Sequence, residues 1–157
     1  MRRVAVIGAG AAGSMAAIFA ASAGAQTLLL ERTKDGGRKI LISGGGRCNV
    51  LPVRVDESRF VTDSSPNILR KMVRSWPLQE QIAFFEGELG IPLVEEKESG
   101  KLFPASHRAR DVRDGLLALA VHRGVSILTN TVVTGFAPSA AGWRIYLEWA
   151  PPLEADA

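Results

Sequence analysis

The N-terminal segment constrains the fold more than any other part of this 157-residue chain. A short apolar run, Val4–Ile7, leads directly into residues 8–13, Gly-Ala-Gly-Ala-Ala-Gly, and then into an alanine-rich stretch that reaches Ser22. This order predicts a β-strand, a tight turn and a helix. A second apolar run, Thr27–Glu31, predicts the next strand, so the segment is typical of the start of a βαβ unit.

The three glycines of the turn have different predicted roles. Gly8 permits the turn, Gly10 lets a pyrophosphate approach the backbone, and Gly13 lets the helix pack closely on the strand. The start of the helix offers free N–H groups and the positive end of its dipole to phosphates. The pattern therefore predicts a dinucleotide site formed by Gly8, Ala9, Gly10, Ala11, Ala12 and Gly13.

Glu31 narrows the choice of dinucleotide. It stands at the end of the second strand, where the dinucleotide fingerprint places an acid that accepts hydrogen bonds from ribose hydroxyls. A carboxylate there repels a 2′-phosphate, which disfavours NADP and leaves FAD and NAD. The adjacent Arg32 keeps NADP open, because a nearby arginine can serve a 2′-phosphate.

A second glycine-rich segment, residues 43–49 (Ser-Gly-Gly-Gly-Arg-Cys-Asn), follows a dozen residues later. Successive glycines expose backbone N–H groups, and basic and hydrogen-bonding side chains surround them. This favours an anion-binding loop; the alternative is a solvated basic loop. The loop's cysteine is expected to be a small packed residue, with a reactive thiol as the alternative. The predicted site residues here are Arg38, Lys39, Ser43, Gly44, Gly45, Gly46, Arg47, Cys48 and Asn49.

The run Gly37–Asn49, with the first glycine pattern before it and residues 100–106 (Gly-Lys-Leu-Phe-Pro-Ala-Ser) after it, resembles the bacterial HI0933-like NAD(P)/FAD-dependent oxidoreductases. This family includes aminoacetone oxidase, and the resemblance covers essentially the whole chain. It implies FAD as the cofactor and NAD(P)H as an electron donor. It further implies that the first glycine turn contacts the pyrophosphate and that Glu31 contacts the adenosine ribose. By the same resemblance, residues 38–49 contact the flavin-side phosphate and ribose, and the backbone of Val133 contacts the adenine.

The resemblance also implies a larger protein. Residues 1–157 are expected to be an FAD-binding Rossmann-like domain, without the substrate domain and the flavin-closing segment with which the family continues. We expect the FAD-binding portion of a flavin-dependent oxidoreductase and assign no catalytic residue. The alternatives are a non-catalytic dinucleotide-binding fragment and an NAD-dependent dehydrogenase domain. The long glycine-rich segment after Glu31 argues against the dehydrogenase.

The rest of the chain predicts an α/β fold of three layers, with a mainly parallel sheet and an antiparallel meander. The third parallel strand is expected at residues 125–128, and a helix with Val112, Leu116 and Leu119 facing inward is expected before it. Residues 51–65 are expected to be a loop. The remaining predicted elements are helices over 67–76, 78–89 and 111–122, a hairpin of 93–96 with 101–103, and meander strands over 131–136 and 143–149.

Composition limits the partners. The net charge of +3 comes from basic residues spread along the chain, without a nucleic-acid-binding signature, so we expect a small-molecule substrate and no nucleic-acid partner. One cysteine excludes an internal disulfide, and no metal-ligand spacing occurs. The uncharged stretch Val4–Leu30 also resembles a signal peptide or membrane span, but its glycines weaken both interpretations. We expect a cytoplasmic protein without a membrane partner and make no prediction of oligomeric state.

Overall fold

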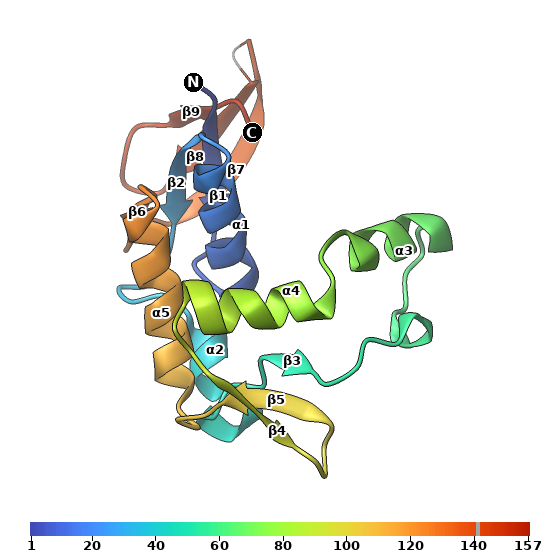
Figure 1. Ribbon diagram of the computed structural model, residues 1–157. Coiled ribbons are helices and arrows are strands. Elements are labelled where there is room, and N and C mark those ends of the chain that lie inside the picture. Colours follow the sequence, from blue (N-terminus) through green and yellow to red (C-terminus); the bar gives the residue numbers. More distant parts are fainter. Residues whose placement is uncertain (141) are drawn as a thin grey trace.

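The computed structural model, which describes residues 1–140 and 142–157, contains a parallel three-stranded sheet. Its strands β1 (Arg3–Ile7), β2 (Gln26–Leu30) and β6 (Ser126–Leu128) lie in the order β1–β2–β6 (Figure 1). In the register, Val4 lies opposite Thr27, and Leu29 lies opposite Ile127. This arrangement confirms the Rossmann-type α/β class and the three predicted parallel strands.

Two helices, α1 (Ala11–Ser22) and α5 (Ala109–His122), pack against one face of this sheet. Leu29 points toward them and is fully buried, together with Ala17 and Ala120, whose small side chains allow the helices to approach closely. The predicted inward-facing side chains of α5 are all buried, namely Val112, Leu116 and Leu119.

The opposite face carries an antiparallel meander of β7 (Val133–Ser139), β8 (Gly142–Leu147) and β9 (Leu153–Ala155). Leu28 and Leu30 alternate with Leu29 along β2 and pack against this layer, as the two-residue period of a strand requires. The two predicted strands of the meander are confirmed. β9 was not predicted, because its run of three residues has no alternating pattern.

The chain returns to the parallel sheet after β9. The N–H of Ala5 donates to the carbonyl of Ala157 at 2.8 Å, and the N–H of Asp156 donates to the carbonyl of Arg3 at 2.8 Å. Residues 156 and 157 therefore lie along the outer edge of β1. The side chain of Ile7, further along that strand, is 51% exposed.

A smaller antiparallel sheet pairs β3 (Leu51–Pro52), β5 (Lys101–Pro104) and β4 (Leu93–Glu96) in that order. The predicted hairpin of β4 and β5 is confirmed. The prediction of a loop throughout 51–65 was wrong in two places. Leu51 pairs with Leu102, and the carboxylate of Asp56 caps a short 3₁₀ turn, η2 (Glu57–Arg59).

Helical segments connect these sheets. The predicted helix over 67–76 is α3 (Pro66–Ser75), which projects from the body of the molecule in Figure 1. The predicted helix over 78–89 begins as α4 (Leu78–Ala83) and continues as one π-helical turn, η3 (Phe84–Glu88), whose Phe85 is buried. Residues 43–49, which we predicted as an anion-binding loop, begin with a short turn, η1 (Ser43–Gly46); the helix before it, α2 (Arg38–Ile42), was not predicted.

Candidate functional site

The first glycine turn lies between β1 and α1, and its glycines differ in what surrounds them. Gly8 has a φ of +96°, and its N–H donates to the carbonyl of Leu30 at 2.7 Å. A Cβ on Gly13 would lie 1.8 Å from the carbonyl oxygen of Gly8, so the fold itself requires this glycine. A Cβ on Gly10 would meet nothing within 4 Å. Gly10 therefore borders open space, as the close approach of a ligand requires.

The N-terminus of α1 faces the same space with free backbone donors. Among the described residues no side chain caps Gly10, the N-cap, and the first turn contains no acid. The first amide bonded within the helix is that of Ser14, which donates to the carbonyl of Gly10 at 2.9 Å. The N–H groups of residues 11–13 are left for a ligand, and the helix dipole favours an anion there.

Glu31 lies at the end of β2 and is 8% exposed. Its Oε2 accepts from the N–H of Ala9 at 2.8 Å, and its Oε1 accepts from the N–H and the hydroxyl of Thr33 at 2.8 and 2.7 Å. Burial raises the pKa of this carboxyl group, but these hydrogen bonds outweigh burial and hold the pKa below its ordinary value. The side chain is thus an anion at neutral pH that fixes the glycine turn.

Thr33 extends this network and was not among the predicted site residues. Its hydroxyl oxygen also accepts from the N–H of Gly36 at 3.2 Å, and the N–H of Gly37 donates to the carbonyl of Ala9 at 2.8 Å. The signal that was missed is local, because a threonine two residues after a carboxylate commonly bonds back to the turn.

These elements enclose a cleft of about 820 Å³. Most of the predicted cofactor-binding residues line it, although they come from three separate segments of the chain. The predicted residues in its lining are Gly8, Gly10, Ala11, Ala12, Gly13, Glu31, Arg32, Arg38, Lys39, Ser43, Cys48 and Asn49. Four lining residues were not predicted: Ile7, Thr33, Gly37 and Ile40.

Arg47 lies outside the lining of this cleft. Its guanidinium is 2.6 Å from the carboxylate of Glu96 and lies 4.4 Å above the ring centre of Phe103. Hydrogen bonds from Ser99 and from Arg47 keep the pKa of Glu96 low, so its carboxylate is ionised at neutral pH. Arg47 therefore ties η1 to the β4–β5 hairpin, and a contact with a cofactor phosphate stays a prediction.

The remaining predicted residues also lie outside the lining of the cleft. Gly44 and Gly45 adopt left-handed φ values of 55° and 67°, and a Cβ on Gly44 would come within 2.9 Å of Asn49 and Phe103. These glycines, with Gly46, form the turn that leads back to Asn49. Ala9 is buried within the first glycine turn, and Val133 packs in the second core beside Leu30. Their contacts with a cofactor stay predictions.

Cys48 is 6% exposed beside the cleft and has a φ of 64°. Burial raises the pKa of its thiol, and a hydrogen bond with Ser43 offsets only part of this effect. The thiol is therefore protonated at neutral pH and a weak nucleophile. The packed-residue interpretation fits this environment better than the reactive thiol.

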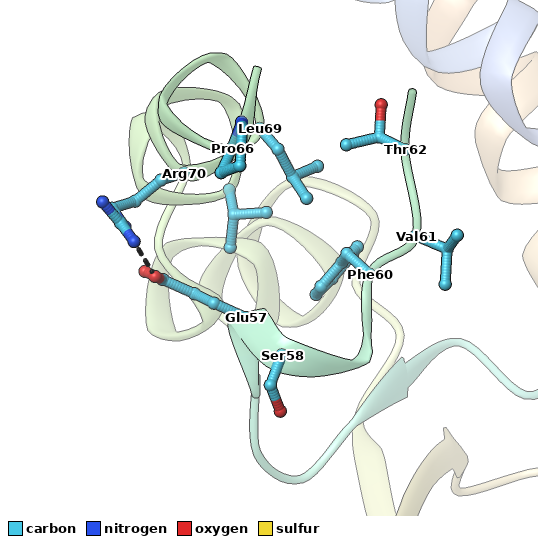
Figure 2. A pocket seen from close by; sticks show the side chains of 9 residues that line it. Glu57, Ser58, Phe60, Val61, Thr62, Pro66, Leu69 and Arg70 are labelled. Atoms are coloured by element: carbon cyan, nitrogen blue, oxygen red, sulfur yellow. Dashed lines mark hydrogen bonds and ion pairs between the residues drawn. The ribbon is translucent and has the colours of Figure 1, made fainter. Parts of the chain in front are cut away.

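A second hollow of about 610 Å³ lies between η2 and α3 (Figure 2). Phe60, Val61 and Leu69 form part of its wall, and at its rim the carboxylate of Glu57 pairs with Arg70 at 3.1 Å. None of the predicted site residues lines it.

Within the described residues no group of three His, Cys, Asp or Glu side chains could hold a metal ion. None of the described helices is long and apolar enough to span a bilayer.

The parallel sheet, the glycine turn and the acid at the end of β2 define a Rossmann-type domain. The sequence matches the family described as HI0933-like protein Rossmann domain over residues 2–153. The chain belongs to this family.

Two relatives match the chain over part of their own length. The chain is 34% identical over 148 residues to a 3-dehydro-bile acid delta(4,6)-reductase of Clostridium scindens, which covers 92% of this chain and 35% of the relative. It is 35% identical over 131 residues to the ribosomal RNA dihydrouridine synthase of Haemophilus influenzae, covering 82% of this chain and 31% of the relative. The chain thus spans about a third of the length of these relatives.

The fold of the chain is similar to that of a solved structure. THI4 of Thermovibrio ammonificans superposes with a TM-score of 0.62 over 97% of this chain and 53% of that chain, at 15% sequence identity. At this identity the likeness concerns the fold alone.

Proposed function

We propose that this chain is the FAD-binding portion of a flavin-dependent oxidoreductase. The observation that carries the proposal is the cleft, in which three features meet: the open side of Gly10, the uncapped start of α1 and the ionised carboxylate of Glu31. A pyrophosphate fits against bare backbone and helix N–H groups, and a carboxylate accepts from ribose hydroxyls.

The choice of FAD over other dinucleotides rests on the far side of the cleft. Glu31 disfavours a 2′-phosphate, although Arg32 also lines the cleft. Beyond the glycine turn the cleft continues along Arg38, Lys39 and Ser43. These basic and hydroxyl side chains suit the flavin-side phosphate and the ribitol of an extended FAD molecule. NAD also has two phosphates but lacks the ribitol, so the part of the cleft beyond the pyrophosphate favours FAD.

The reaction is proposed from the relatives. One is named a reductase and the other a dihydrouridine synthase, and both names denote reduction. We assign electron transfer to the flavin, which this domain would bind and orient, and electron donation to NAD(P)H. A small-molecule substrate remains our proposal. The two relatives differ in substrate class although this domain matches both, so its shared features are not expected to select the substrate.

The visible spectrum of the purified chain tests the cofactor. After incubation with FAD and desalting, we expect a flavin absorption band that remains with the protein. A folded, colourless chain that binds NAD but not FAD would overturn the assignment in favour of a dehydrogenase domain. Binding of FAD without reduction by NADH or NADPH would be consistent with a non-catalytic fragment.

A further inference from the structure

The described part of the chain buries two charged side chains almost completely, Glu31 and Arg113. Glu31 belongs to the candidate site. Arg113 comes from the middle of α5 and is not in the lining of the cleft. A guanidinium is costly to remove from water unless its donors find acceptors, so its partners indicate its purpose.

Arg113 bonds to the turn that precedes α2. One terminal nitrogen, Nη1, donates to the carbonyl of Asp35 at 3.2 Å and makes a longer contact with the carbonyl of Gly36 at 3.5 Å. Its Nε pairs with the carboxylate of Asp114. The aliphatic part of the side chain covers Gly37 so closely that a Cβ there would lie 2.3 Å from Cγ of Arg113.

The same turn is also held by residues of the site itself. The N–H of Gly36 donates to the hydroxyl of Thr33, which is bonded to Glu31, and the N–H of Gly37 donates to the carbonyl of Ala9. The two buried charges therefore act on one turn, residues 35–37: Arg113 binds its carbonyls, and Glu31, through Thr33, binds one of its N–H groups. Gly37 is also the N-cap of α2, whose first residues, Arg38 and Lys39, line the cleft.

We propose that Arg113 is a positioning residue for the nucleotide cleft, acting through the turn 35–37. By fixing the carbonyls of this turn, it sets the start of α2 and hence the place of Arg38 and Lys39 relative to the first glycine turn. Its ligand-related role rests on the function proposed above, namely binding of FAD. The contacts between Arg113 and the turn do not depend on that function.

Arg113→Met tests this, because methionine keeps much of the apolar stem and removes the donors. Arg110→Met, at an exposed position of the same helix, is the matched control. We expect Arg113→Met to weaken FAD binding about tenfold or more, the effect of losing about one charge-assisted hydrogen bond. We also expect faster hydrogen–deuterium exchange over residues 33–42 in the cofactor-free protein, and neither change in the control.

The outcomes separate the two proposals. An FAD affinity within twofold of wild type and unchanged exchange at 33–42 in Arg113→Met would overturn the positioning role. If that variant does not fold, Arg113→Gln decides, because its amide ends two atoms short of the position of Nη1: weakened FAD binding at an unchanged thermal midpoint supports the role, and wild-type affinity refutes it. If the wild type binds no FAD, the proposed function fails, and ADP replaces FAD as the probe in the same series. A wild type that binds neither refutes both.

Discussion

Gly10 offers the sharpest test of the site, because the structure separates its role from that of Gly13. In Gly10→Ala the new methyl group meets no protein atom within 4 Å, and φ of −84° suits any residue. The expected cost to folding is that of a poorer N-cap, about 0.5–1 kcal/mol. For a chain of this size this lowers the thermal midpoint by about 1–4 °C.

Binding should respond more strongly than folding. The methyl group of Gly10→Ala occupies the side from which a pyrophosphate would approach the backbone, so we expect FAD affinity to fall at least about tenfold. Flavin fluorescence quenching measures the affinity, and thermal unfolding of the cofactor-free chain measures stability.

Gly13→Ala is the matched comparison. Its Cβ would lie 1.8 Å from the carbonyl oxygen of Gly8, so α1 must move away from β1. We expect a loss of about 1–3 kcal/mol in stability, the range for overpacking a close contact. If Gly10→Ala binds FAD as tightly as wild type, or if it destabilises the chain as much as Gly13→Ala does, the assignment of the open side of Gly10 to a ligand is refuted.

Three further predictions follow from buried groups. Glu31→Gln leaves a backbone N–H of Ala9 or Thr33 without an acceptor and should cost about 1–3 kcal/mol at pH 7. Because the folded-state pKa of Glu31 is lowered, the ionised side chain stabilises the fold above its ordinary pKa of 4.5, and this stabilisation is lost as the pH falls through the folded-state value. In urea unfolding, the stability of Glu31→Gln should therefore fall less at acid pH than that of the wild type. An identical pH dependence in the two proteins would contradict this. In the native chain Cys48 should react with a thiol reagent much more slowly than it does in the urea-unfolded chain, and equal rates in the two states would refute its burial. Leu116→Ala, at 2% exposure in the core, should lose about 2–5 kcal/mol in calorimetry; a loss under about 1 kcal/mol would contradict the packing of α5 on the sheet.

Much of the candidate site could be predicted because its signals are local. The strand, turn and helix from Val4 to Ser22 follow one another without a break, and Glu31 ends the next strand. In such a unit the backbone carries each residue to the same end of the sheet, so spacing along the chain is enough to place them near one another.

Other parts could not be predicted because their partners are remote in sequence. Arg47 is basic and follows three glycines, which suggested a phosphate ligand, yet its guanidinium pairs with Glu96 on a hairpin. Arg113 lies on the buried stripe of α5, between Ala109 and Leu116, where a charged residue is unusual. That position was a usable signal, but nothing local in the sequence indicated that its acceptors would be the carbonyls of residues 35 and 36.

The sequence by itself determined the Rossmann-type unit and the chemistry available to it: a turn that Gly8 and Gly13 permit, bare backbone at Gly10, and a carboxylate at the end of the second strand. These depend on residue type and short spacing, which local sterics translate directly into conformation. Only the tertiary structure decided which charges face the cleft. Glu31 and Arg38 border it, whereas Arg47 and Arg113 bond to protein groups, because packing α5 and the hairpin against the turns supplies acceptors that no local pattern encodes.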